Sequence, residues 1–138
     1  MKFNSQICTT REQSERLLAL GLKRETADMH HSYYTRVSFN GIKSHFWKEE
    51  TGYSENAIPA WSMNRLMCML PRCVENGYHL VMSYDHIAYR TTYDDVTTWW
   101  RGGGNVYDMI IETIEWLIQK GIFNKEYLQE QADNRREE

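Results

Sequence analysis

The sequence predicts a single α+β domain in which helices pack on one face of an antiparallel sheet of four or five strands. Segments with the start and stop residues of helices alternate with short segments of strand character. The connections between the strand-like segments are short, which favours antiparallel pairing. A chain of 138 residues is long enough for one core. We expect the domain to span residues 1–123, followed over residues 124–138 by a polar tail that is partly helical or frayed.

The first predicted element is a helix over residues 10–20. Thr10 and Gln13 have the spacing of a capping box, in which each side chain binds the backbone amide of the other residue. Gly21 suits the left-handed conformation that ends many helices. We expect one further helical turn within residues 24–29, with the side chain of Met29 pointing inward.

A β-hairpin is predicted around the dipeptide Asn40-Gly41. Residues 33–39 and 42–47 alternate with the period of strands, and Asn-Gly accepts the positive φ angles of a type I′ turn. This turn sets the register, so that one face of the hairpin is largely apolar. The other face would carry the side chains of Tyr34, Arg36, His45 and Trp47.

A short helix over residues 63–70 is predicted next. Ser62 is a suitable N-cap, and Pro71 ends the helix because the residue before a proline avoids the helical conformation. Two turns are too short to be stable alone, so packing must hold the helix in place. We expect that packing to come from Leu66, Met67 and Leu70.

Strand character returns over residues 78–84, 87–91 and 96–101, which are rich in β-branched and aromatic residues. Asp85-His86 is expected to turn the chain between the first two of these strands, and three glycines end the third.

The longest predicted helix covers residues 106–120, between the N-cap Asn105 and Gly121. Its polar side chains fall on one narrow stripe, and most of the rest are apolar. Such a helix must lie deep against a sheet. The stripe consists of Asp108, Glu112, Glu115 and Gln119.

Composition indicates a cytoplasmic protein. No apolar run approaches the roughly 20 residues that span a bilayer, and the first residues lead into no signal-peptide core. The three cysteines form no CxxC pair, which favours reduced thiols. The chain has 16 Lys and Arg against 19 Asp and Glu, a net charge of −3, which argues against a nucleic-acid partner. We expect no membrane contact.

Four segments together resemble a known group of sequences. They are residues 12–22, residues 25–29, Pro59-Ala60-Trp61-Ser62 with Leu70-Pro71, and the helix that carries Trp116. They resemble a group of small uncharacterised proteins carried by phages and mobile genetic elements of gut bacteria, over about residues 8–120. The resemblance implies a bacterial cytoplasmic setting and an accessory role, and it implies no site residues.

No residue spacing is typical of a catalytic or metal site. The histidines and cysteines do not match zinc-site spacings, and no nucleophile elbow or phosphate-binding lysine motif is present. Cys8 precedes the first helix, whose dipole could lower a thiol pKa, but an inert thiol is the alternative. Asp94-Asp95 fits turn chemistry, and the acidic stripe fits a solvated helix face. We expect no catalytic residues, no cofactor and no metal.

The strongest candidate for a ligand site is the Gly-rich start of the last helix. Glycines let backbone amides approach an anion, a helix N-terminus presents unpaired N–H groups, and indoles can stack on a planar group. The alternative is a connection that only reverses the chain. The candidate residues are Trp99, Trp100, Arg101, Gly103, Gly104 and Asn105.

Aromatic residues are more numerous than one small core usually absorbs, with five Trp and nine Tyr. Exposed Tyr and Trp are typical of protein interfaces, and the polar face of the predicted hairpin is one candidate surface unless the tail or a loop covers it. We hypothesise a non-enzymatic binding or regulatory module that contacts a protein partner or itself. The competing hypothesis is a small anion- or nucleotide-binding protein. The residues that cannot all be buried are Tyr34, Trp47, Trp61, Trp99 and Trp100.

Overall fold

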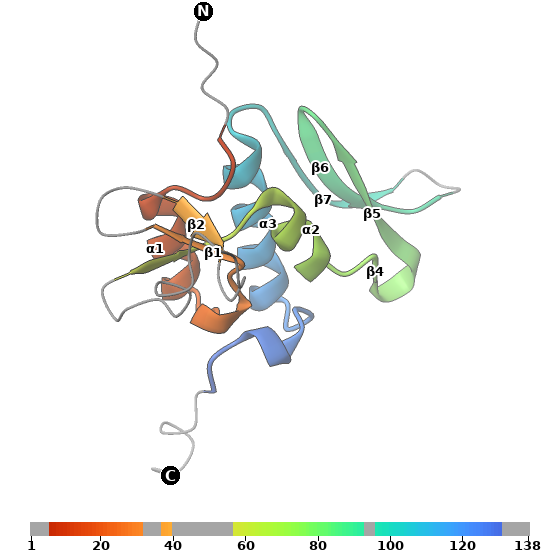
Figure 1. Cartoon of the computed structure of the whole chain (residues 1–138). Helices are drawn as coiled ribbons and strands as arrows, with labels where there is room; N and C mark the ends of the chain where they lie inside the picture. The colour runs from red at the N-terminus through yellow and green to blue at the C-terminus, as the bar shows by residue number, and fades with distance from the viewer. Residues whose placement is uncertain (1–5, 32–36, 40–56, 93–95, 131–138) are drawn as a thin grey trace, which may run out of the picture.

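The computed structural model describes residues 6–31, 37–39, 57–92 and 96–130. Over these residues the fold is α+β, as predicted, with two antiparallel sheets. Helix α3 (Val106–Gln119) runs through the centre of the molecule. The four-stranded sheet lies on one side of it, and the three-stranded sheet with helix α1 (Arg11–Ala19) lies on the other (Figure 1).

Helix α1 begins at the predicted capping box. The backbone N of Gln13 donates to Thr10 Oγ1 at 3.1 Å, and the backbone N of Thr10 donates to Gln13 Oε1 at 3.0 Å. Gly21 follows the helix with a φ of 105°. A 3-10 turn, η1 (Arg24–Thr26), confirms the further helical turn, and Met29 is buried as expected. Met29 nevertheless lies in a strand and not in a helix.

The three-stranded sheet was not predicted as a unit. It has the order β2-β1-β3, formed by β1 (Met29–His31), β2 (Val37–Phe39) and β3 (Ile58–Ala60), and all pairs are antiparallel. Strand β2 falls within the predicted strand 33–39. The rest of the predicted hairpin lies outside the described residues, as do the candidate surface residues Tyr34, Arg36, His45 and Trp47.

Helix α2 (Met63–Met69) confirms the predicted short helix, and Ser62 Oγ accepts the backbone N–H of Arg65 at 3.1 Å. Leu66 and Leu70 are buried, but Met67 is 43% exposed, so its predicted packing role is wrong. Met69 is buried instead, three positions after Leu66 on the same face of the helix. Leu70 follows the helix in an extended conformation, so its burial does not bring Met67 to the buried face.

The four-stranded sheet has the order β4-β5-β6-β7, and every pair is antiparallel. Its last three strands confirm the strands predicted between residues 78 and 101, with a turn at Asp85. The first strand has only two residues and is followed by the 3-10 turn η2 (Glu75–Gly77), so the sequence pattern did not reveal it. The strands are β4 (Cys73–Val74), β5 (Tyr78–Ser83), β6 (His86–Arg90) and β7 (Thr97–Gly102).

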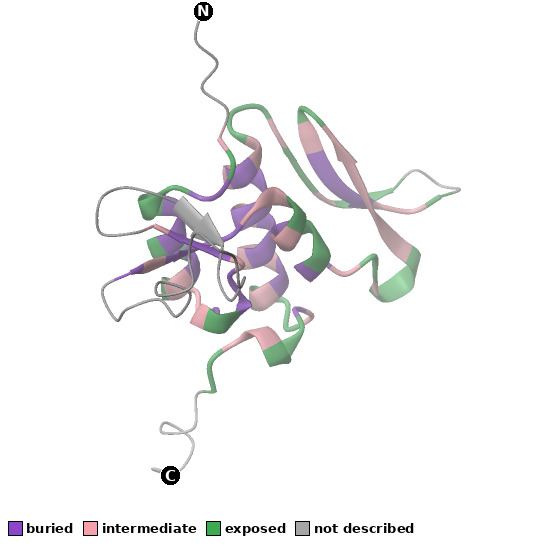
Figure 2. Ribbon diagram, viewed as in Figure 1, coloured by how far each residue is buried: buried purple, intermediate pink, exposed green. Residues whose placement is uncertain are grey.

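Helix α3 covers one face of this sheet, against β6 and β7, as the predicted fold requires. Its apolar side is buried and its polar stripe reaches the surface, which Figure 2 shows as alternating purple and pink or green along the helix. The buried residues are Tyr107, Met109, Ile110, Ile111, Thr113, Ile114 and Leu117.

The last described segment pairs with the residues that follow α1. It contains the 3-10 turn η3 (Lys125–Tyr127). The backbone N of Lys23 donates to the Tyr127 carbonyl at 2.9 Å, and the backbone N of Gln129 donates to the Gly21 carbonyl at 2.7 Å. No helix in the described parts of the chain has the length and apolar character needed to cross a membrane.

Candidate functional site

Strand β7 presents two adjacent indoles on opposite sides of the four-stranded sheet, because successive side chains of a strand alternate. Trp99 points toward α3. Its ring stacks on Trp116 with 4.9 Å between centroids, and its Nε1 donates to Thr113 Oγ1 at 2.9 Å. The guanidinium of Arg101 lies 4.0 Å above the Trp99 ring, and Arg101 Nε donates to Glu112 Oε1 at 2.8 Å. Trp99 and Arg101 therefore tie the sheet to the helix.

Trp100 points away from α3 and is 55% exposed. Its ring is stacked with the His86 imidazole, with centroids 6.4 Å apart and planes 18° from parallel. The indole lies across Gly102, where a Cβ atom would fall 2.6 Å from Trp100 Cζ2. Only glycine at this position leaves room for the ring where it lies.

The Gly-rich turn leads into a helix start whose amides already have partners. Asn105 Oδ1 accepts the backbone N–H groups of Tyr107 and Asp108, at 2.8 and 3.2 Å. Gln13 Nε2 donates to Asp108 Oδ1 at 2.7 Å, so a carboxylate lies in the first turn of α3. Gly103 and Gly104 have φ angles of 80° and 72°, which reverse the chain.

The six candidate ligand residues thus occupy three separate places. Trp99 and Arg101 lie toward α3, Trp100 lies on the opposite side of the sheet, and the remaining three form the turn and cap. The structure does not bring them together into one pocket. Sequence reasoning missed Gln6, whose Oε1 accepts from Asn105 Nδ2 at 2.8 Å, because no local pattern links residues so far apart.

Asn105→Ala is expected to lower the free energy of unfolding by about 1 kcal/mol, within a range of roughly 0.5–2 kcal/mol. The substitution removes the oxygen that accepts two backbone amides at the start of α3. Urea denaturation measures the change. Asn105→Ser is the matched control because it keeps an oxygen acceptor, and an equal loss in both variants would contradict the capping role.

One face of the four-stranded sheet points away from α3. We call the side chains on this face the open face. Alternate residues of the strands, such as Leu80, Tyr89 and Trp99, belong to or pack against the core. The residues between them point outward, and no described helix packs over them (Figure 1). The open face consists of His79, Val81, Ser83, His86, Arg90 and Trp100, with the buried Ala88 between them.

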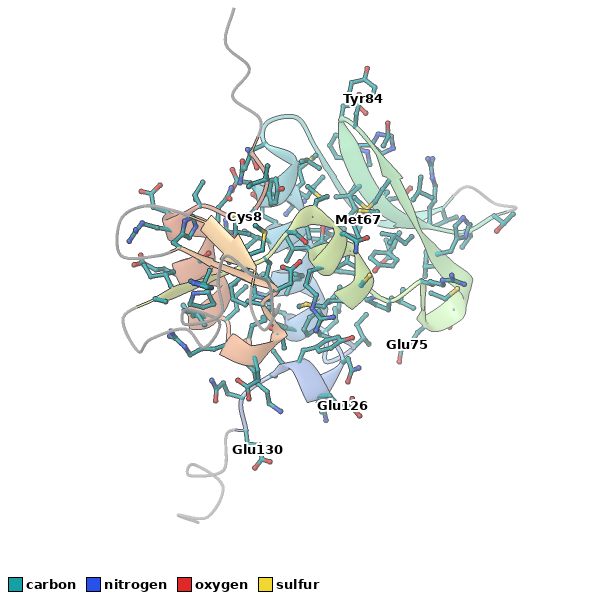
Figure 3. The ribbon with its side chains drawn as sticks, viewed as in Figure 1. Cys8, Met67, Glu75, Tyr84, Glu126 and Glu130 are labelled. Carbon is teal, nitrogen blue, oxygen red and sulfur yellow. The ribbon has the colours of Figure 1, made fainter. Side chains whose placement is uncertain are left out.

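The β5–β6 turn borders the open face. Tyr84 is 90% exposed there, at the end of the hairpin in Figure 3. Asp85 Oδ1 lies 3.0 Å from His86 Nδ1. This hydrogen bond to His86 lowers the pKa of Asp85, so its carboxylate stays charged at neutral pH. A negative charge therefore stands at one end of the open face.

On the α3 side, a shallow groove of about 440 Å³ runs between β7 and α1. Its two arginines are both paired with glutamates from α3: Arg16 NH2 lies 3.2 Å from Glu115 Oε1, and Arg101 pairs with Glu112. These charges cancel within the groove, so it presents no excess charge to a ligand.

The three cysteines differ in exposure. Cys8 is buried, and burial, with a smaller contribution from the nearby Asp28 carboxylate, raises the pKa of its thiol to about 11. A nucleophile needs the opposite shift, so the position of Cys8 before α1 does not activate it. Cys68 and Cys73 are exposed. Within the described residues, no group of three or more His, Cys, Asp or Glu side chains could hold a metal ion.

Cys8 is expected to react with a disulfide reagent such as DTNB at least about 100-fold more slowly at pH 8 than an exposed thiol, because two pKa units reduce its thiolate fraction by that factor. Cys68 and Cys73 are exposed and should react quickly, giving the rapid phase of the increase in absorbance from the released thiolate of the reagent. Cys8→Ala should remove only the slow phase, and urea should make all three thiols rapid. Three equal rates in the folded protein would contradict the burial of Cys8.

The chain matches no protein-family model, and comparisons with curated proteins and with solved structures give no significant match.

Proposed function

We propose that this protein is a non-enzymatic binding module that contacts another protein, or a second copy of itself, through the open face. The single observation that carries the proposal is Trp100, a large aromatic side chain that is 55% exposed on a sheet face without a described covering element. Trp, together with Tyr and Arg, is enriched among the residues that dominate binding energy at protein interfaces.

The surroundings of Trp100 support this proposal. Stacking with His86 and contact with Gly102 hold the indole against the sheet, so little side-chain entropy remains to be lost on binding. The neighbouring Val81 on β5 is partly exposed and adds some apolar surface, whereas Ala88 between the two strands is buried. A rigid aromatic group within a small apolar area is the usual centre of an interface.

The competing function, binding of a small anion or nucleotide at the Gly-rich start of α3, has less support. Asn105 already satisfies the first amides, and the carboxylate of Asp108 lies where an anion would bind. The resemblance to proteins of phages and mobile genetic elements supports a cytoplasmic setting for the binding module and an accessory role.

Site-specific photo-crosslinking in cells tests the proposal. A benzophenone amino acid at position 84, beside the open face, is expected to give covalent adducts with protein. The same group at position 126 is the control, because Glu126 lies far from the open face (Figure 3). Trp100→Ser should abolish the adducts formed from position 84. Equal adducts from both positions, or none from position 84, would contradict the proposal.

A further inference from the structure

We propose that the partner binds as an extended segment of a different polypeptide, which adds a strand to the four-stranded sheet beside β7. This inference rests on the proposed function and adds the form in which the partner is recognised. The observation behind it is that β7 leaves two backbone N–H groups without partners, next to an exposed indole on one side of the sheet and a groove on the other.

Strand β7 forms one edge of the four-stranded sheet, and β4 forms the other. Strand β4 has only two residues and leads directly into η2, so it offers little backbone for pairing. Strand β7 has six residues and no proline, which is one of the devices that keep exposed edges from pairing. Of the two edges, that of β7 is therefore the one able to accept another strand.

Successive residues of β7 direct their backbone groups alternately toward β6 and away from it. The backbone N of Gly103 donates to the Asp85 carbonyl at 3.0 Å, so Arg101, two positions earlier, also faces β6. Trp100 and Gly102 therefore direct their N–H groups away from β6, and no described residue accepts a hydrogen bond from either. The Trp100 carbonyl accepts from Arg101 Nη1 at 2.9 Å, and its second lone pair is available to a partner.

These two N–H groups require a partner with an extended backbone. They are two residues apart on a strand, a separation of about 6.8 Å. The carbonyls on one side of an extended strand repeat at this spacing, whereas those of a helix are bonded within the helix. A second copy of β7 fits less well. The two side chains that it would place in the groove, Trp99 and Arg101, are already held against their own α3.

The groove of about 440 Å³ between β7 and α1 lies on the α3 side of this edge. Its lining includes part of the polar stripe of α3. Side chains of an added strand alternate, so those opposite Trp99 and Arg101 would point into the groove. The arginines of the groove are already paired with glutamates, which favours uncharged polar side chains at these positions of the partner.

The side chain opposite Trp100 would lie on the open face, beside the exposed indole. An apolar side chain fits there, because it would cover part of the ring. The partner is thus an extended segment in which apolar and uncharged polar residues alternate. In such strand addition, backbone hydrogen bonds supply affinity and alternate side chains supply specificity.

A peptide selection on the full chain tests this form of recognition. Random 12-residue peptides displayed on phage are selected on the wild-type protein, and the strongest binders are synthesised. We expect the selected sequences to alternate apolar and uncharged polar residues and to bind with dissociation constants below about 100 μM. A selection that yields no peptide with a dissociation constant below about 1 mM would overturn the inference.

Amide hydrogen exchange, followed by NMR, locates a selected peptide on the protein. The Trp100 and Gly102 amides should exchange at least about tenfold more slowly when the peptide is bound, because they gain hydrogen-bond acceptors. Trp99 and Arg101 are the controls within the same strand, since their amides already face β6 and should change much less. Slowing of the Trp100 and Gly102 amides on concentration of the protein alone would identify a second copy as the partner and overturn the inference.

Methylation of the peptide nitrogens tests the added strand from the other side. Methyl groups on the nitrogens that face β7 should weaken binding by about 30-fold or more, because each removes a donor and places a bulky group between the strands. Methyl groups on the intervening nitrogens should change binding by less than about threefold, since those nitrogens face away from β7. Equal effects at successive positions would contradict strand addition.

Trp100→Ser should weaken peptide binding by about tenfold or more, through loss of the apolar contact on the open face. Met67→Ser is the matched control. Met67 is another exposed apolar side chain, but it lies on α2 and not beside β7, so its loss should leave the dissociation constant unchanged (Figure 3). Circular dichroism confirms that each variant folds.

The proposed function fails on a different result from this inference. Adducts from position 84 that depend on Trp100, found together with peptides that leave the Trp100 and Gly102 amides unprotected, would overturn strand addition and leave the binding function standing. An absence of adducts from position 84 contradicts the proposed function, whatever the peptides do.

Discussion

Trp61→Ala is expected to lower the free energy of unfolding by about 3–5 kcal/mol, the largest single loss we expect from this chain. The Trp61 side chain has no exposed surface and belongs to the main core. Its Nε1 donates to Thr26 Oγ1 at 3.0 Å, and that hydroxyl donates in turn to the Lys23 carbonyl. Truncation leaves a cavity and removes the indole N–H that donates a hydrogen bond to Thr26 Oγ1.

Urea denaturation of Trp61→Ala, followed by circular dichroism, measures this loss. Trp100→Ala is the matched control, because the same residue type is removed from an exposed position and the loss should be below about 1 kcal/mol. Trp61→Phe should fall between the two, since it keeps most of the apolar volume but not the indole N–H. Similar losses at positions 61 and 100 would contradict the burial described here.

Ile114→Ala is expected to cost about 2–5 kcal/mol of unfolding free energy. Ile114 lies on the buried side of α3 and has no exposed surface. Helix α3 contacts the four-stranded sheet, α1 and α2, so a cavity there weakens packing on several sides.

Gln119→Ala, at the exposed end of the same helix, is the control for Ile114→Ala and should change stability by less than about 0.5 kcal/mol. Thermal or urea unfolding of the two variants gives the comparison. A small loss at position 114 would mean that α3 is not the centre of the core.

The helices could be predicted from the sequence because their signals are local. Thr10 and Gln13 are three positions apart and form both hydrogen bonds of the capping box. Asn105 caps α3 through residues two and three positions ahead. The polar stripe of α3 follows from helical periodicity alone, and it correctly identified the side that faces the core.

The three-stranded sheet could not be predicted because its pairing is not local. Each of its strands has only three residues, too few to show alternation. Met29 pairs with Ala60, which lies 31 positions further along the chain. Pro59 also argues against a central strand, and it is tolerated because β3 is an edge strand among the strands that the structure describes.

The residues of the candidate ligand site lie on both sides of strand β7 and not in one place. Adjacent residues of a strand point to opposite sides, so Trp99 and Trp100 could not have formed one stacking surface. The expectation that some indoles remain exposed is correct for Trp100, whereas Trp61 is fully enclosed and Trp99 is partly buried. The hydrogen bond from Gln13 to Asp108 joins residues 95 positions apart, and no local sequence pattern predicts such a contact.

The Trp100 ring can lie where it does because residue 102 is a glycine and has no Cβ atom. A methyl group at position 102 would push the ring off the sheet, and it would also lie 3.2 Å from the backbone oxygen of Asp85. Gly102→Ala would therefore move the exposed indole on which the proposed binding surface depends. The orientation of an exposed aromatic group is thus set by a residue that has no side chain of its own.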